Sequence, residues 1–176
     1  YLPSHAGQHG HLSGGRKNLK WLDSLVGHIT LIPLAQSHDI LKATHLKHHA
    51  HTNDPERDPD YFHTHVNSWF ECAKNINDQY SPNGRIIGIV EKLSEEDPKF
   101  SETLEKGSAV IFIYYLANIV LALFFPLETL LLWWIPKRIA TCYLGIVFSY
   151  QPHAGLESGR YKDTRFWTNK IPRFFN

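Results

Sequence analysis

Two long apolar stretches dominate the pattern of hydrophobic and polar positions along the chain. Residues 107–127 carry no charge and lie between Lys106 and Glu128. At about 1.5 Å per residue, a helix of this length spans roughly 30 Å, the thickness of the hydrocarbon core of a bilayer. Residues 139–156 are also uncharged, and a polar break at residues 136–138 separates the two stretches. The pattern predicts a membrane-embedded helical hairpin; a core hairpin of a soluble protein is the alternative, but it requires a larger chain.

The basic residues around this hairpin predict which side of the membrane each end faces. Its turn is expected to carry Lys137 and Arg138, and the neighbouring Trp133 and Trp134 suit an interfacial belt. The opposite face carries the larger basic group, which comprises Lys99, Lys106, Arg160, Lys162, Arg165, Lys170 and Arg173. Because cytoplasmic loops are rich in Lys and Arg, this face is expected to be cytoplasmic, and the second helix returns His153 to it.

Composition narrows the classes of function that fit this pattern. The chain has 176 residues, enough for one domain, and its net charge of +1 shows no nucleic-acid-binding excess of basic residues. Its two cysteines, Cys72 and Cys142, are too few for a disulfide framework or a four-thiolate metal site. Any metal must therefore be held by nitrogen and oxygen, and the 12 histidines make that feasible.

The histidines group into two clusters with helical spacing. His45, His48 and His49 stand at positions i, i+3 and i+4, and His5 and His9 at i and i+4, so each set projects from one face of a helix. Neutral imidazoles can hold a transition metal without repelling one another, and two clusters predict a site for more than one ion. Incidental histidines on a solvated helix are the alternative. Three further histidines are not predicted to be ligands: His11, His63 and His65.

These clusters change the interpretation of a third apolar stretch, residues 21–34, which lies between them. If both clusters serve one site, they lie on the same side of the membrane, so the intervening segment crosses twice or not at all. Crossing once takes about 20 residues, so residues 22–34 cannot cross twice. We expect an interfacial or re-entrant helix, although a buried helix of a soluble bundle fits this segment equally well.

An acidic loop follows the second histidine cluster. Two Asp-Pro steps end the helix, and the loop supplies Asp54, Asp58 and Asp60. A carboxylate that accepts the second N–H of a ligand imidazole orients the ring and raises its basicity, and we predict this role for the three aspartates. An ordinary charged surface loop is the alternative.

The two histidine boxes, the hairpin and His153 together resemble the membrane fatty acid desaturase superfamily. Residues 48–60, 150–153 and 160–163 are similar to the bacterial and cyanobacterial carotene hydroxylases of that superfamily. The resemblance covers residues 5–165. It implies an all-α protein in which an integral membrane helical hairpin supports a cytoplasmic helical cap with histidine boxes. It also implies two non-haem iron ions, held by His5, His9, His45, His48, His49 and His153.

The sequence departs from the family pattern in two places. The third histidine box, another HxxHH, is missing, and so is the first membrane hairpin. The chain also contains no methionine. We therefore interpret residues 1–176 as a single, truncated desaturase-like domain, an internal fragment of a longer protein that is inactive by itself.

The resemblance implies an oxygen-dependent oxidation of unactivated C–H bonds in a membrane lipid. The reaction would be fatty acyl desaturation or carotenoid ring hydroxylation at a di-iron site that uses O2, with electrons from a ferredoxin or a cytochrome. The residues leave the substrate and the choice between these reactions open. A zinc-binding hydrolase is disfavoured because the sequence has no HExxH motif. A non-catalytic membrane protein with incidental histidines is the other alternative.

Overall fold

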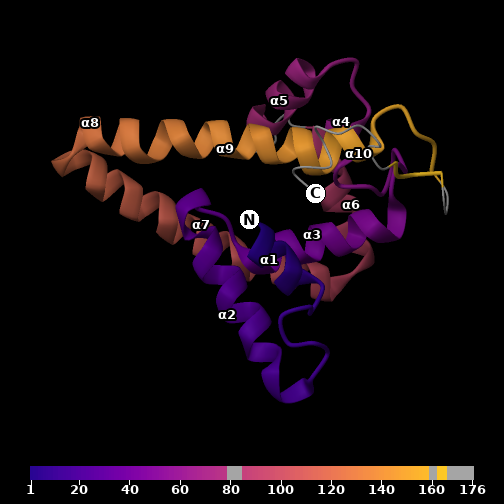
Figure 1. Cartoon of the computed structure of the whole chain (residues 1–176), viewed down its shortest axis with the longest axis horizontal. Coiled ribbons are helices and arrows are strands. Elements are labelled where there is room, and N and C mark those ends of the chain that lie inside the picture. The colour runs from indigo at the N-terminus through magenta and orange to yellow at the C-terminus, as the bar shows by residue number, and fades with distance from the viewer. Residues whose placement is uncertain (79–84, 159–161, 166–176) are drawn as a thin grey trace, which may run out of the picture.

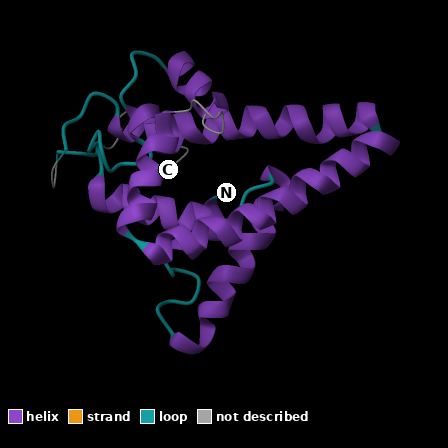
Figure 2. Ribbon diagram, turned by 180° about the vertical axis from the view of Figure 1, so that it is seen from behind, coloured by secondary structure: helices purple, strands orange, loops and turns teal. Residues whose placement is uncertain are grey.

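The computed structural model describes residues 1–78, 85–158 and 162–165, and this part of the chain contains helices and loops but no strand (Figure 2). This confirms the all-α prediction. The elements in chain order (Figure 1) are α1 Leu2–Gln8, the 3-10 turn Lys17–Leu19, α2 Lys20–Leu31, the 3-10 turn Ile32–Leu34, α3 His38–His51, α4 Tyr61–Thr64, α5 Trp69–Asp78, α6 Arg85–Glu96, α7 Pro98–Phe124, α8 Pro126–Glu128, the π-helical turn Thr129–Trp134, α9 Ile135–Gly145, the π-helical turn Ile146–Tyr150 and α10 Gln151–His153.

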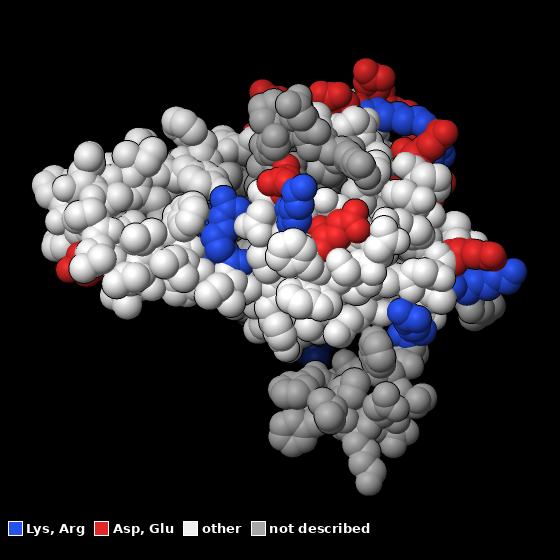
Figure 3. Space-filling model, turned by 90° about the horizontal axis from the view of Figure 1, so that it is seen from above, with Lys and Arg blue, Asp and Glu red and all other residues white. Residues whose placement is uncertain are grey.

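Two helices form a long apolar hairpin that projects from the other elements (Figure 1). The first is α7, whose start is fixed by Asp97: the carboxylate accepts hydrogen bonds from the backbone N–H groups of Lys99 and Phe100. The second runs without interruption over Pro126–His153, and we call it the second hairpin helix. Both are long and apolar enough to cross a membrane, as predicted, and the hairpin surface carries few charged side chains (Figure 3).

The predicted position of the turn is wrong. The chain reverses at Phe125, and the second helix starts at Pro126 and continues through residues 136–138. Proline suits the first turn of a helix, where its missing N–H is not needed, so Pro126 can start one. The wider π-helical turn Thr129–Trp134, which ends two residues before Pro136, accommodates the second ring.

The part of the orientation prediction that placed Lys137 and Arg138 at the turn is therefore also wrong. Lys137 and Arg138 lie within the second hairpin helix and not at the tip, so they do not mark the opposite face of the membrane. Lys99 and Lys106 lie toward the open end of the hairpin, on α7. Three members of the predicted basic group lie outside the described residues: Arg160, Lys170 and Arg173.

Helix α2 and the turn after it occupy the short apolar stretch predicted between the histidine clusters. Neither is among the helices that could span a membrane, which agrees with the length estimate. One helical face exposes a row of apolar side chains at i, i+4, i+8 and i+11: Trp21, Leu25, Ile29 and Ile32. The end of the segment is attached to the hairpin, because the Trp133 indole N–H donates to the carbonyl of Pro33 at 2.6 Å. Its interfacial or re-entrant placement stays a prediction.

Close approaches at two glycines position the helices that carry the histidines. A Cβ on Gly7 would lie 2.6 Å from the carbonyl oxygen of Asp23, so only glycine lets α1 pack this closely on α2. A Cβ on Gly107 would lie 2.4 Å from Cγ1 of Ile40, which holds α3 against the hairpin. A small core of Ile89, Leu93 and Phe100 packs against Ala43 of α3. These contacts bring α1, α3 and the open end of the hairpin together.

Candidate metal centre

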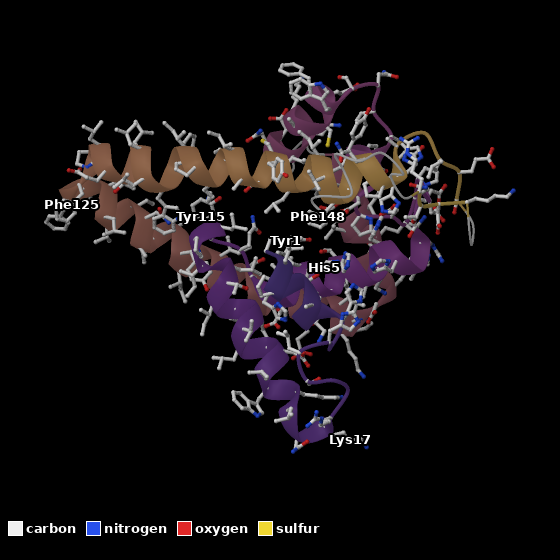
Figure 4. All side chains as sticks on the ribbon, in the orientation of Figure 1. Tyr1, His5, Lys17, Tyr115, Phe125 and Phe148 are labelled. Carbon is white, nitrogen blue, oxygen red and sulfur yellow. The ribbon has the colours of Figure 1, made fainter. Side chains whose placement is uncertain are left out.

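All six predicted ligands lie at the open end of the hairpin, on three segments that are far apart in the sequence. Helix α1 carries His5, and His9 is the C-cap residue that follows this helix, while α3 carries the second box. His153 is the last residue of α10, at the end of the second hairpin helix. The local reason is helical spacing, and the tertiary reason is that α1 and the hairpin both pack against α3, with His5 beside α3 (Figure 4).

Four of the six form what we call the first histidine cluster: His5, His9, His45 and His49. The Nε2 atom of His45 lies 3.0 Å from Nε2 of His9 and 3.0 Å from Nε2 of His49. The ring centroid of His5 lies 4.7 Å from that of His45, and one ligand nitrogen each of His5, His9 and His45 fit within 4.8 Å. Nitrogens from α1 and α3 therefore converge on one point.

The other two form the second histidine pair, His48 and His153, whose Nε2 atoms lie 3.3 Å apart. Their outer nitrogens are already engaged: Nδ1 of His48 bonds the Asp58 carboxylate at 2.7 Å, and Nδ1 of His153 bonds the carbonyl of Asp163 at 2.7 Å. Such bonds place the proton on Nδ1 and leave Nε2 as the free donor atom. The pair adjoins the first cluster, since the ring centroids of His48 and His49 lie 5.6 Å apart.

These separations fit cations bound between the rings. Two nitrogens bound at about 2.1 Å to one ion, at right angles, lie about 3.0 Å from each other. The three measured Nε2–Nε2 distances are 3.0, 3.0 and 3.3 Å. Lone pairs that face one another at this distance need a shared proton or a cation between them. The donor set, imidazole with carboxylates nearby and no thiolate, suits iron among the transition metals, and zinc and copper also accept it.

Burial and mutual repulsion keep the first cluster neutral at physiological pH. Burial, together with the neighbouring imidazoles, lowers the pKa of His45 to about 3 and that of His49 to about 4. The same causes lower the pKa of His5 and of His9. For His48, burial lowers the pKa, but the hydrogen bond to Asp58 and the negative charges of the nearby aspartates together outweigh it and leave the pKa above its ordinary value. Neutral imidazoles keep the lone pairs that metal binding requires.

The three aspartates of the acidic loop lie in different surroundings. Asp58 is fully buried and bonds His48, as the predicted role requires. The Asp60 carboxylate accepts a hydrogen bond from the Ser149 hydroxyl at 2.9 Å. Burial raises the pKa of Asp60, but nearby histidines, chiefly His48, lower it by a larger amount, so this pKa lies below its ordinary value. Asp54 accepts a hydrogen bond from the backbone N–H of Glu56 within the loop.

A cavity of about 350 Å³ lies beside the first cluster, in the open end of the hairpin. Its walls are mainly apolar and come from α3, α5, α6, α7 and the second hairpin helix, for example Leu41, Ile76, Val90, Leu104, Leu144 and Phe148. His45 belongs both to the first cluster and to the cavity wall, so the cavity adjoins the cluster. A cavity of roughly 150 Å³ holds a benzene ring, and this one can hold a hydrocarbon segment about twice as large.

Polar residues of this wall that were not predicted from the sequence include Tyr1, His63 and Ser149. Burial, with Asp60 nearby, raises the pKa of Tyr1 to about 12, so its phenol stays protonated. A helical-spacing signal was available for two of them, because Tyr1 precedes His5 by four residues and Ser149 precedes His153 by four. His63 is buried near Asp60. The other histidines not predicted as ligands are placed differently: exposed His11 stacks on His9, and His65 bonds the carbonyl of Leu156.

Comparison with known proteins gives one match. A family model described as fatty acid desaturase matches residues 1–176. No curated protein matches the chain, and no solved structure matches it.

Proposed function

Because this chain belongs to the fatty acid desaturase family, we propose that it is a membrane-bound, non-haem di-iron enzyme that uses O2 to oxidise unactivated C–H bonds of a lipid. The family suggests a lipid-modifying oxidoreductase. The observation that carries the proposal is the convergence of imidazole nitrogens, 3.0 to 3.3 Å apart, beside an apolar cavity. Two adjacent groups of donors fit two ions better than one.

The first histidine cluster would hold one iron, and the second histidine pair would contribute to holding the other. Bound iron would supply the activation of O2 that an unactivated C–H bond requires, since amino acid side chains lack such chemistry. The protein contributes position and polarity. Asp58 and the carbonyl of Asp163 fix the rings of His48 and His153 so that each Nε2 atom points inward.

The cavity would bind the hydrocarbon part of the substrate and exclude water from it. Its aliphatic walls favour a hydrocarbon, and the shared wall at His45 would bring one segment of it beside the first cluster. The hydroxyl of Ser149 donates to Asp60 and holds that carboxylate at the polar end of the cavity. Orientation of one C–H bond against a fixed site accounts for much of the rate that such a protein can supply.

The proposal also includes the membrane, the electron donor and the substrate. The two apolar helices suggest membrane association, and we place the histidine groups on the cytoplasmic face, where an electron donor such as a ferredoxin or a cytochrome could reach them. The substrate is a fatty acyl lipid or a carotenoid, and the reaction is desaturation or ring hydroxylation. We keep the carotene hydroxylase-like branch as the nearest relative within the family on the sequence of residues 48–60.

Metal analysis tests this function. Protein expressed from its complete gene and purified in detergent should contain about two irons per chain and convert a lipid substrate when supplied with reductant and O2. His45→Ala should lose both iron and product. His51→Ala is the matched control, because His51 lies on the same helix but outside the first cluster and the second pair. Zinc in place of iron would favour the hydrolase, and turnover by His45→Ala would refute the assignment.

A further inference from the structure

Three exposed basic residues lie at the start of α2, and we call them the basic end: Arg16, Lys17 and Lys20. No ion pair among the described residues includes any of them. Residues 1–22 contain no Asp or Glu, and the first acidic residue along the chain, Asp23, is buried. The segment that carries the positive charge of the basic end therefore does not neutralise it.

A buried carboxylate fixes the shape of the turn before the basic end. Asp23 accepts hydrogen bonds from the backbone N–H groups of Leu12 and Ser13, at 3.1 and 3.0 Å. The next two residues, Gly14 and Gly15, take the left-handed conformation, with φ of 57° and 75°, which glycine adopts without strain. The basic end is therefore held at a defined position beside α2.

The face of α2 that continues from the basic end is apolar. It carries the exposed side chains described above, which we call the apolar row: Trp21, Leu25, Ile29 and Ile32. The opposite face packs on the helices that carry the histidines, since Gly7 of α1 closely approaches Asp23, and the ring of His38 closely approaches Gly27. The apolar row therefore points away from the histidine groups.

Helix α2 runs obliquely beside the hairpin. The end of the apolar row is attached to the second hairpin helix at Trp133, which lies between the tip and the residues of that helix that line the cavity. At the other end of α2, Lys17 lies to the side of the hairpin and, like His5, far from Phe125 at the tip (Figure 4). With the tip embedded in a bilayer, the apolar row descends into the leaflet on the histidine side, and the basic end stays at its surface.

We propose that the basic end and the apolar row together form a docking surface for anionic phospholipids, with phosphate groups at the basic end and acyl chains along the row. Helices with an apolar face and basic residues bind membrane surfaces in this way, and each Lys or Arg near an anionic surface strengthens the attraction by about fivefold. Neutral lipid, or an apolar segment of protein, would match the row but not the three charges. The proposal goes beyond the proposed function, because it concerns the lipids that surround the protein and not the lipid that reacts.

Amide hydrogen exchange of the full chain in nanodiscs tests this surface. One set of discs contains phosphatidylcholine alone, and the other contains phosphatidylcholine with phosphatidylglycerol, which is anionic. Helix α2 should exchange more slowly in the anionic discs, by about tenfold or more, because opening of the helix then also releases the basic end from the surface. Salt at about 0.5 M should remove most of this difference, since it screens charges at a surface.

The double variant Lys17→Gln, Lys20→Gln should lose most of the difference between the two kinds of disc. The double variant Lys74→Gln, Lys162→Gln is the matched control, because it removes two exposed positive charges that lie outside α2, and it should keep the difference. Exchange of α3, measured in the same samples, reports whether each variant is folded.

Equal exchange of α2 in the two kinds of disc would overturn the proposal, and so would a difference that survives Lys17→Gln, Lys20→Gln. Slower exchange that appears only in discs with two chains would assign the apolar row to a second copy of the chain and would also overturn it. Absence of iron or of product, with the effect of anionic lipid intact, would count against the proposed function alone.

Discussion

Exchange of Asp58 for asparagine perturbs the support of the second histidine pair without changing the size of the side chain. The Asp58 carboxylate is fully buried and accepts three hydrogen bonds. They come from His48 Nδ1 at 2.7 Å, from the backbone N–H of Asp60 at 2.8 Å and from the backbone N–H of Asn53 at 2.7 Å. In Asp58→Asn, one oxygen becomes an NH2 group, which donates hydrogen bonds. Whichever way the amide is turned, at least one buried N–H then faces a donor.

The expected loss of stability follows from these three hydrogen bonds. One buried N–H without an acceptor costs about 1–3 kcal/mol, and the remaining bonds lose the strength that a charged acceptor gives them. We therefore expect Asp58→Asn to lower the free energy of unfolding by about 2–4 kcal/mol in the metal-free protein. Because the ring of His48 also loses its fixed orientation, iron affinity should fall by about 10-fold to 100-fold.

The measurements are thermal unfolding of the metal-free protein and an iron titration of each variant. Asp54→Asn is the matched control, since Asp54 stands in the other Asp-Pro step of the same loop and its side chain bonds only the N–H of Glu56 among the contacts described. An amide oxygen can replace that contact, so we expect little change. Equal effects of the two substitutions on stability and on iron affinity would refute a specific role for Asp58.

Three further substitutions test the packing and the cavity. Gly27→Ala should lower the melting temperature, because its Cβ would lie 2.2 Å from the buried ring of His38, a clash worth about 1–3 kcal/mol. For Asp23, burial raises the pKa, but the Ser13 side chain and the backbone N–H groups of Ser13 and Leu12 together lower it more. Its stabilising contribution therefore exists above pH ~4 and disappears in stronger acid. The melting temperatures of wild type and Asp23→Asn should thus converge below that pH. Gly145→Ala would place a Cβ 2.0 Å from Cδ1 of Ile76 in the cavity wall and should select shorter hydrocarbon substrates, as product analysis would show.

Each of these three substitutions has a control variant or a result that would contradict the prediction. Gly88→Ala adds a methyl group where nothing lies within 4 Å, so it should leave the melting temperature unchanged. A constant difference in melting temperature between wild type and Asp23→Asn at all pH values would contradict the carboxylate's role. For Gly145→Ala, the second change Ile76→Val should restore longer substrates, and an unchanged product distribution in the single variant would show that Ile76 does not limit the cavity.

Much of the site could be predicted because its parts are local. The spacing of His5 and His9, and of His45, His48 and His49, fixes which rings share a helical face, and that depends only on the pitch of a helix. The absence of charge over residues 107–127 likewise predicts an apolar helix, and α7 covers most of that stretch. Family membership followed from the same motifs.

The position of the hairpin turn could not be read from the residues in the same way. Pro126 and Pro136 are the same residue type, and both follow apolar segments. Only the folded chain shows that one starts a helix while the other is absorbed after a π-helical turn. The position of the turn also decides where Lys137 lies. It was expected in a loop, but it lies within the hairpin, beside Tyr115.

The sequence by itself thus determined the helical class, the apolar hairpin and the identity of the candidate ligands, since periodicity and composition act between near neighbours in the chain. The tertiary structure decided which nitrogens approach to 3.0 Å, that Asp58 supports His48, and that a cavity joins His45 to the hairpin. These are contacts between segments tens of residues apart. They depend on close packing at positions such as Gly7 and Gly107, where the shapes of two surfaces must match. The spacing of residues within one segment does not predict that match.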